Sequence, residues 1–347
     1  MTTAHKSRVL DMTRGDPFRL VLQFSLPLFC SNLLQQVYNL TDTALAGHLL
    51  GSAALAEIGA TAALYGLIMN FAFGMNNGLA LTVFGAGEQE GIRRAVGWMV
   101  TLSAAVSLVL TTVSLLGRGA LLQALQVPAE VWDGAAAYLT VILLGIPLTM
   151  LYNMEAALLR AVGNSVTPLL FLLFSSVLNV GLDAAFMGPL GMGVRGAAVA
   201  TVLAQGISAV LGAVYLVRSY PELHFTPAHF KKSTRRAVMN MFWAGMSMGL
   251  MSAIYNLGSV ALQSSINALG GVYITAQTAA RRMAEMYFIP GGALGISVAT
   301  FSSQNLGAGR RSRIGQSVRA ALKIYFVWWL FVLAFTFLLG EPVLRLI

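Results

Sequence analysis

Long apolar stretches separated by short polar connections make up most of the chain. A stretch of about 20 mostly apolar residues is near the length that crosses a 30 Å hydrocarbon core as a helix. Nine such stretches occur, and each predicts a membrane-spanning helix. The second and eighth exceed one crossing, so we expect them to tilt or to extend past the membrane. The nine stretches cover residues 20–45, 53–84, 95–117, 134–158, 165–187, 196–217, 237–265, 272–303 and 317–339.

The overall composition agrees with a membrane protein and excludes a soluble domain. Hydrophobic residues make up 57% of the 347 residues and charged residues only 10%. A helical protein with several membrane spans is the class that this balance indicates. The net charge of +9 does not indicate nucleic-acid binding, because the basic residues lie in the short connections between apolar stretches.

The distribution of Lys and Arg predicts the orientation in the membrane, because cytoplasmic connections are enriched in both. Only three basic residues, Arg118, Arg195 and Arg345, fall on the side opposite the N-terminus. We therefore predict that the N-terminus lies in the cytoplasm. The seventeen basic residues on the N-terminal side are Lys6, Arg8, Arg14, Arg19, Arg93, Arg94, Arg160, Arg218, Lys231, Lys232, Arg235, Arg236, Arg310, Arg311, Arg313, Arg319 and Lys323.

An internal repeat predicts the architecture. Three pairs of similar segments recur in the same order, at offsets of 219, 222 and 223 residues. Six predicted spans separate equivalent points, so both copies have the same orientation, as in transporters built from parallel repeats. The pairs are LLGSAALAE at 49–57 with ALGGVYITA at 268–276, GAG at 85–87 with GAG at 307–309, and LLG at 115–117 with LLG at 338–340.

The repeat predicts a division into two lobes of six helices each, of which about nine helices are present. The first lobe covers residues 1–220 with six helices, and residues 221–236 form a cytoplasmic linker. A partial second lobe with three helices occupies residues 237–347. Continuing the same offset predicts a complete protein of about 440 residues and twelve spans. On this interpretation the chain is a fragment or the product of an interrupted gene.

Two acidic residues inside the predicted spans are candidates for a cation-coupling site. Acidic residues are costly within a bilayer and commonly face a cavity or a partner. Asp42 lies one helical turn after Tyr38, and Asp183 lies one turn after Asn179, so each pair shares a helix face. Thr201 could add a hydroxyl oxygen. These oxygens suit Na⁺, and the two carboxyl groups could instead share a proton.

For the other polar residues of the spans, the sequence allows more than one role. Asn39, Asn153 and Glu155 are candidates for the substrate cavity, together with Tyr38. Glu155 could equally form an ordinary interfacial pair with Arg160. Arg281 and Glu285 have i,i+4 spacing, which favours a structural ion pair over a substrate contact. The alternative for the acidic pair is structural: Asp42 reaches interfacial water, and Asn179 and Asp183 hold helices together.

Several motifs resemble the multidrug and toxic compound extrusion (MATE) family, in its bacterial DinF-like branch. The resemblance implies twelve helices in two lobes and export of organic cations or other amphiphiles in exchange for H⁺ or Na⁺. It also implies that Asp42, Asn179, Asp183 and Thr201 hold the coupling cation, with Tyr38 beside them. The motifs are FSLPL at 24–28, YNLTDT at 38–43, GAG at 85–87, LLRAVGNSVTPLL at 158–170, NVGLD at 179–183, GVRGAAVATVLAQ at 193–205 and FSSQNLGAGRR at 301–311.

The sequence carries no common catalytic motif in a context that would indicate an enzyme. It lacks G-x-x-x-x-G-K-[ST] and H-E-x-x-H. G-x-S-x-G occurs once, as GMSMG at 245–249, but inside the seventh apolar stretch rather than at the strand-to-helix turn that a catalytic serine requires. We expect a monomeric antiporter without a cofactor, whose partners are lipophilic or cationic small molecules and the bilayer. The seventh stretch holds no acid, so coupling should depend on the first lobe. The alternatives are an inactive remnant and a flippase for lipid-linked oligosaccharides, which would need buried Lys or Arg; the first-lobe spans are expected to contain none.

Overall fold

The computed structural model describes residues 9–85, 88–231, 233–267 and 271–344, and the regular elements within these ranges are helices. Lys6, Arg8, Lys232 and Arg345 of the charge pattern lie outside the described residues, as do 86–87 and 268–270 of the repeat. The long helices are α2 (Pro17–Leu50), α3 (Ser52–Gly85), α4 (Gln89–Leu116), α6 (Trp132–Val162), α7 (Val166–Met187), α8 (Val194–Ser219), α10 (Arg235–Asn267), α11 (Gly271–Gly307) and α12 (Ser312–Leu344).

Each of the nine predicted stretches forms a helix, and eight of the described helices are long and apolar enough to cross a membrane. The exception is α11, which forms over the eighth stretch but carries Arg281, Arg282 and Glu285 in its first half. α3 and α11 have 34 and 37 residues, so both exceed a single perpendicular crossing, as predicted. Short helices occupy two connections: α5 (Arg118–Ala124) follows α4, and α9 (Pro227–Lys231) precedes α10.

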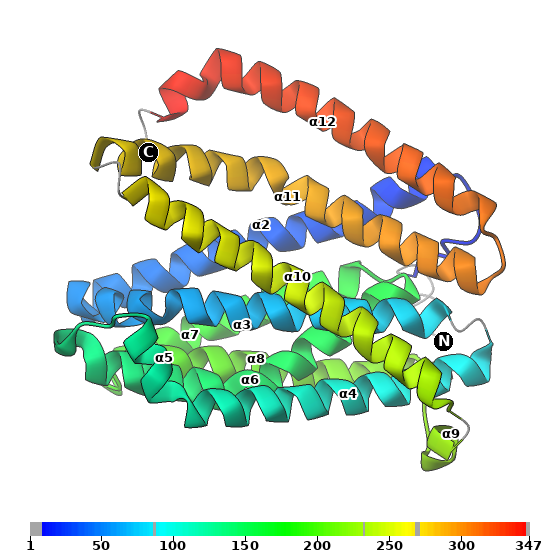
Figure 1. Ribbon diagram of the computed structural model, residues 1–347, viewed down its shortest axis with the longest axis horizontal. Coiled ribbons are helices and arrows are strands. Elements are labelled where there is room, and N and C mark those ends of the chain that lie inside the picture. The colour runs from blue at the N-terminus through cyan, green and yellow to red at the C-terminus, as the bar shows by residue number, and fades with distance from the viewer. Residues whose placement is uncertain (1–8, 86–87, 232, 268–270, 345–347) are drawn as a thin grey trace.

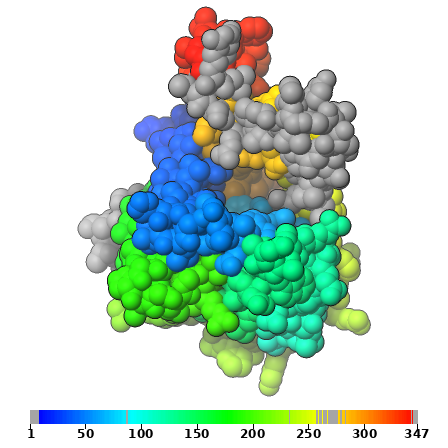
Figure 2. All heavy atoms as spheres, turned by 90° about the vertical axis from the view of Figure 1, so that its left-hand side faces the viewer, coloured from blue at the N-terminus to red at the C-terminus, as the bar shows by residue number. Residues whose placement is uncertain are grey.

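The long helices form two groups. The first helix group contains α2, α3, α4, α6, α7 and α8, and the second contains α10, α11 and α12 (Figure 1). In Figure 1 the two groups approach each other at the end where the chain begins and diverge toward the opposite end. Seen from that opposite end, the second group stands above the first (Figure 2). The predicted lobe boundaries at residues 220 and 237 remain a prediction.

The seam between the groups is formed by α3 and α10, which pack closely because both present glycines. A Cβ atom on Gly78 would lie 2.5 Å from the carbonyl oxygen of Ala244, and one on Gly74 would lie 2.5 Å from that of Met248. A Cβ atom on Gly245 of α10 would lie 2.9 Å from the Leu79 side chain and 3.2 Å from the carbonyl oxygen of Met75, both on α3. The absence of a side chain is therefore what allows these two backbones to touch.

A short segment before α2, residues 9–16, ties the two groups together at the end where they meet. The backbone N–H of Leu10 donates to the carbonyl oxygen of Gly163, after α6, at 3.0 Å. The N–H of Met12 donates to Oε1 of Gln304 on α11 at 3.2 Å, and Asn305 Nδ2 donates to the carbonyl oxygen of Met12 at 2.9 Å. We call residues 9–16 the N-terminal strap. Its Met12 side chain is fully buried.

Direct bonds between the groups reinforce the strap. Gln304 Nε2 donates to the carbonyl oxygen of Ala161 on α6 at 2.8 Å, and Ser303 Oγ donates to that of Leu81 on α3. Asp16 then begins α2, because its side chain accepts a hydrogen bond from the N–H of Arg19 at 2.9 Å and Pro17 stands at the first helical position. The closed end of the molecule is thus fixed mainly by hydrogen bonds to backbone carbonyls.

Candidate functional site

The acidic residues predicted to act together meet inside the first helix group. Asp42 comes from α2 and Asp183 from α7, and the carboxyl groups of the two residues interact directly. Asp183 and Asn179 are 0% and 1% exposed, so this is the interior of the group rather than its surface. α8 closes the site with Thr201, whose hydroxyl oxygen accepts a hydrogen bond from Asn179 Nδ2 at 3.4 Å. The structure therefore brings together all four residues predicted to bind the coupling cation.

The oxygen atoms at this site are unusually poor in hydrogen-bond partners. Apart from the contacts among these three residues themselves, both carboxyl oxygens of Asp183, Oδ1 of Asp42 and Oδ1 of Asn179 are buried without a hydrogen-bond partner. Buried polar atoms are normally hydrogen-bonded, and two ionised carboxylates side by side repel each other. A shared proton or a small hard cation would satisfy these oxygens, since both are attracted by carboxylate and amide oxygens. The donor set therefore fits the predicted H⁺ or Na⁺.

The local sequence explains why these atoms meet. Tyr38 and Asp42 are one turn apart on α2, and the Tyr38 hydroxyl lies beside Thr201 of α8. Asn179 and Asp183 are one turn apart on α7, which packs against both α2 and α8. Thr201 donates to the carbonyl oxygen of Ala197 on its own helix at 3.0 Å, which leaves its lone pairs directed at the site.

Two tyrosines and a glutamine that the sequence did not single out also belong to the surroundings of this site. Tyr65 of α3 and Tyr138 of α6 both interact electrostatically with Asp42. The Tyr65 side chain hydrogen-bonds Gln205 of α8, and Gln205 accepts a hydrogen bond from Thr149 Oγ1 at 2.6 Å. Gln205 lies one turn after Thr201, a spacing that could have indicated it. The two tyrosines give no such signal, because tyrosine is common in ordinary packing.

Three of the four predicted substrate-cavity residues, Asn39, Asn153 and Glu155, contact groups other than the acidic pair. Asn39 is exposed and accepts a hydrogen bond from Gln35 at 3.2 Å. Asn153 is half-buried and donates to the carbonyl oxygen of Thr149 on its own helix at 2.9 Å. Tyr38 interacts with both acids. The assignment of all four to a substrate cavity stays a prediction.

Glu155 has a separate position between α6, α7 and α8. It is 4% exposed, and a Cβ atom on Gly212 of α8 would lie 2.3 Å from its Oε2. Its Oε1 has no hydrogen-bond partner. The interfacial pair considered for Glu155 and Arg160 is wrong: Glu155 lies against Gly212 of α8, whereas the Arg160 guanidinium donates to Asn77 of α3. Glu155 and Arg160 are five residues apart on α6, so their side chains lie on different faces of this helix.

Arg160 overturns a second expectation, that the first-lobe spans contain no buried basic residue. It lies in the last turn of α6 and is only 7% exposed. The sequence placed it in a polar connection because the apolar stretch ends at about residue 158. The helix continues to Val162, and packing of α3 and α11 against this turn buries the side chain.

The predicted pair of Arg281 and Glu285 is present on α11. Arg281 Nε and Glu285 Oε1 are 3.0 Å apart, and both side chains are about half exposed. An exposed pair of this kind contributes about 0.3–0.5 kcal/mol.

In the part of the chain that the structure describes, no group of three or more His, Cys, Asp or Glu side chains could hold a metal ion.

The fold and the buried carboxyl pair together define a polytopic membrane transporter. The chain belongs to the MatE family, because the model of that family matches residues 27–185 and 247–347. This confirms the resemblance to multidrug and toxic compound extrusion proteins that the sequence motifs indicated.

Individual relatives agree with this assignment. The chain is 28% identical over 311 residues to "Probable multidrug resistance protein YpnP" of Bacillus subtilis, with 88% of this chain and 69% of the relative covered. It is 26% identical over 319 residues to "Probable multidrug resistance protein YoeA" of the same organism, covering 89% and 69%. Among solved structures, "Crystal structure of MATE in the straight conformation" has a TM-score of 0.86 at 25% identity, covering 99% of this chain and 76% of that one.

Proposed function

We propose that this protein exports organic cations or other amphiphiles across a bacterial inner membrane in exchange for H⁺ or Na⁺. The observation that carries the proposal is the pair of Asp42 and Asp183 inside the first helix group, three of whose four carboxyl oxygens are buried without a hydrogen-bond donor. The names of the relatives, which are multidrug resistance proteins, support the general activity. We expect transport without a cofactor.

The pair suits coupling because its occupant changes the charge inside the first helix group. With neither a proton nor a cation, two carboxylates repel each other in a place of low dielectric constant. Binding of one positive charge removes most of that repulsion, and the preferred packing of α2 against α7 and α8 changes with it. Exchange requires that the cation and the drug have different affinities for two conformations. In this proposal the bound cation favours one packing of α2 and the drug favours the other.

Transport by single Asn variants tests the proposal. Native protein, Asp42→Asn and Asp183→Asn are reconstituted in vesicles, and flux of a lipophilic cation is measured under an imposed pH gradient and, separately, an imposed Na⁺ gradient. Asp133→Asn is the matched control, because Asp133 is an exposed acid at the start of α6. Each pair variant should lose at least about tenfold in gradient-driven flux, and the control should retain it. Undiminished flux in both pair variants would remove the pair from the mechanism.

A further inference from the structure

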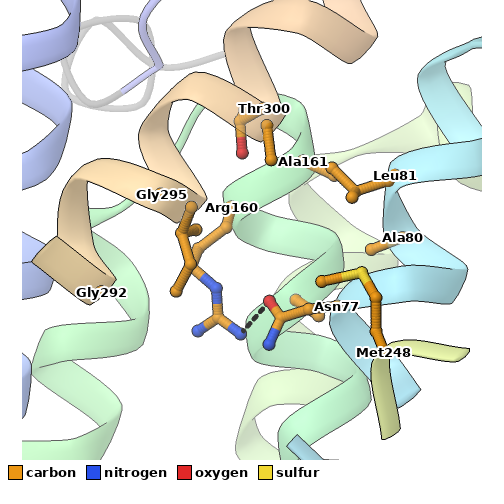
Figure 3. A pocket seen from close by; sticks show the side chains of 12 residues that line it. Asn77, Ala80, Leu81, Arg160, Ala161, Met248, Gly292, Gly295 and Thr300 are labelled. Carbon is orange, nitrogen blue, oxygen red and sulfur yellow. Dashed lines mark hydrogen bonds between the residues drawn. The ribbon is translucent and has the colours of Figure 1, made fainter. Parts of the chain in front are cut away.

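Between the two helix groups lies a cavity of about 310 Å³ that contains the guanidinium of Arg160 (Figure 3). Its walls come from α3 and α6 of the first group and from α10 and α11 of the second. Most of the lining is apolar, including Leu81, Met248 and Ile296. The cavity is of the size at which small-molecule sites begin.

The positive charge of Arg160 is poorly compensated. Nη2 donates one hydrogen bond to Asn77 Oδ1 at 3.1 Å, and the guanidinium lies 5.5 Å from the centre of the Phe73 ring. Its Nε is buried without a partner. Arginine stays protonated in proteins, so this charge is permanent, and leaving a buried charge unpaired is costly.

No acid of the four lining helices reaches Arg160 among the described residues. Glu57 of α3 lies against Gly134 near the start of α6, and Glu155 faces Gly212 of α8. Asp133 is exposed at the start of α6, and Glu285 of α11 pairs with Arg281. The sequence of α10 contains no acidic residue. The charge is therefore available to a ligand that enters the cavity.

Two interactions within the protein stabilise the buried Arg160 guanidinium without a ligand, but each is weak. Arg160 stands in the last turn of α6, where the helix dipole favours a cation by about 0.3–1 kcal/mol. The face of Phe73 adds a contribution of similar size. Neither contact supplies a full negative charge or a hydrogen bond to Nε. A structural role alone thus leaves the guanidinium incompletely satisfied.

The opposite wall offers room for a ligand next to the guanidinium. A Cβ atom on Gly292 or Gly295 of α11 would meet no atom within 4 Å, so these positions border open space. Figure 3 shows the guanidinium pointing into the space between α3 and α11, with Asn77 on one side. Thr300 adds a hydroxyl to the same lining.

We propose that this cavity binds an acidic amphiphile, with its anionic oxygen group on Arg160 and its apolar body against the aliphatic walls. A carboxylate, sulfonate or phosphate would accept from Nε and from the remaining guanidinium N–H groups. The apolar part of the ligand follows from the lining, which is aliphatic except near Asn77, Arg160 and Thr300. The site is distinct from the pair of Asp42 and Asp183, which lies inside the first helix group and attracts cations.

Binding of tritiated decanoate to the purified full chain in a non-ionic detergent tests this proposal. Arg160→Gln should weaken binding at least tenfold, whereas Arg160→Lys should retain part of the affinity. Arg118→Gln is the matched control, because Arg118 is an exposed arginine that donates to Thr140 Oγ1 at 2.6 Å, and it should bind decanoate normally. Thermal unfolding of each variant shows whether it is folded.

A second variant and a competition series keep the test valid if Arg160→Gln fails to fold. Gly295→Leu leaves every charge unchanged and fills the open space, so it should also weaken binding at least tenfold. In native protein, unlabelled decanoate should displace the tritiated probe, whereas decyltrimethylammonium and acetate should not at the same concentration.

Three results would overturn the proposal. A folded Arg160→Gln protein that binds within twofold of native would show that the guanidinium does not hold the ligand. Equal displacement by decyltrimethylammonium would show that the site does not select an anion. Equal displacement by acetate would show that the ligand is a free anion rather than an amphiphile. Because the readout is binding, failure here leaves the proposed cation coupling untouched.

Discussion

The acidic pair and Arg160 are buried charged groups of opposite sign in two different kinds of place. Asp42 and Asp183 lie inside the first helix group, between α2, α7 and α8, and three of their four carboxyl oxygens lack hydrogen-bond donors. Arg160 lies between the two groups, in a cavity that α10 and α11 help to close. A charge inside one group responds to small changes in helix packing within that group. A charge between groups changes its surroundings whenever the groups move apart.

This difference suggests that the two sites can be perturbed independently. The seam of α3 and α10 and the strap bonds hold the groups together, and none of them contacts the acidic pair. A change at the seam should therefore affect Arg160 first. A change on α7 should affect the acids and leave the cavity intact.

The largest effect on stability is expected at Gly78. A Cβ atom there would lie 2.5 Å from a backbone oxygen of α10 and 2.8 Å from the Cα atom of Gly245, so Gly78→Ala must push the two helices apart. We expect a loss of about 1–3 kcal/mol and weaker decanoate binding, measured by thermal unfolding and by the binding assay.

Gly59→Ala is the matched control on the same helix, because a Cβ atom at Gly59 would meet nothing within 4 Å. The better helix propensity of alanine should stabilise this variant by about 0.5–1 kcal/mol. The two substitutions thus have opposite expected signs. Equal stability of both variants would show that the α3 and α10 backbones do not need their close contact.

The sequence predicts one of these two sites better than the other, for a physical reason. Asp42 and Asp183 are acids within long apolar stretches, so their cost in a membrane is by itself an indication of function. The one-turn spacings to Tyr38 and Asn179 give the faces on which they lie. The helices themselves follow from apolar length alone, and all nine predicted stretches form helices.

Arg160 could not be predicted in the same way. An arginine two residues after an apolar stretch is typical of an interfacial connection, and nothing local indicates that α6 continues past it. Its burial depends on α3 and on α11, which follows about 110 residues later in the chain. Contacts of that range are set by how helices pack, and a single sequence does not reveal them. The same limit applies to Tyr65 and Tyr138 beside the acidic pair.

Glu155 provides an intermediate test, because it is a buried acid of the first helix group outside the proposed site. Glu155→Gln should leave gradient-driven flux unchanged, since this side chain faces Gly212 and is separated from Asp42 and Asp183. The unfolding temperature should change by no more than about 3 °C, because an amide has nearly the size of the buried carboxyl group that it replaces. Flux falling as far as in Asp183→Asn would assign coupling to Glu155 and remove the distinction between this acid and the pair.

The smallest effect is expected at Asp11 of the N-terminal strap, which holds the closed end beside Arg160. Partial burial alone would raise the pKa of Asp11, but hydrogen bonds from Thr13 and the positive charges of Arg14 and Arg310 outweigh it and lower the pKa below its usual value. Thr13 donates to Asp11 Oδ1 from its backbone N–H at 2.9 Å and from its hydroxyl at 2.6 Å. A lowered pKa means that the ionised carboxylate stabilises the folded state.

That stabilisation is present above the pKa of the unfolded chain, about 3.9, and is lost as the pH falls through the lower pKa of the folded state. Asp11→Asn should therefore lower the unfolding temperature at pH 7, and the difference from native protein should shrink below about pH 4. The side chain of Asp11 is 59% exposed, so solvent screening limits the effect at pH 7 to at most about 1 kcal/mol. Unfolding temperatures of native and variant protein between pH 3 and pH 7 measure it, with Asp133→Asn as the exposed control. A difference that stays constant over this range would show that the strap is held by its backbone bonds to Gly163, Gln304 and Asn305 without help from the carboxylate.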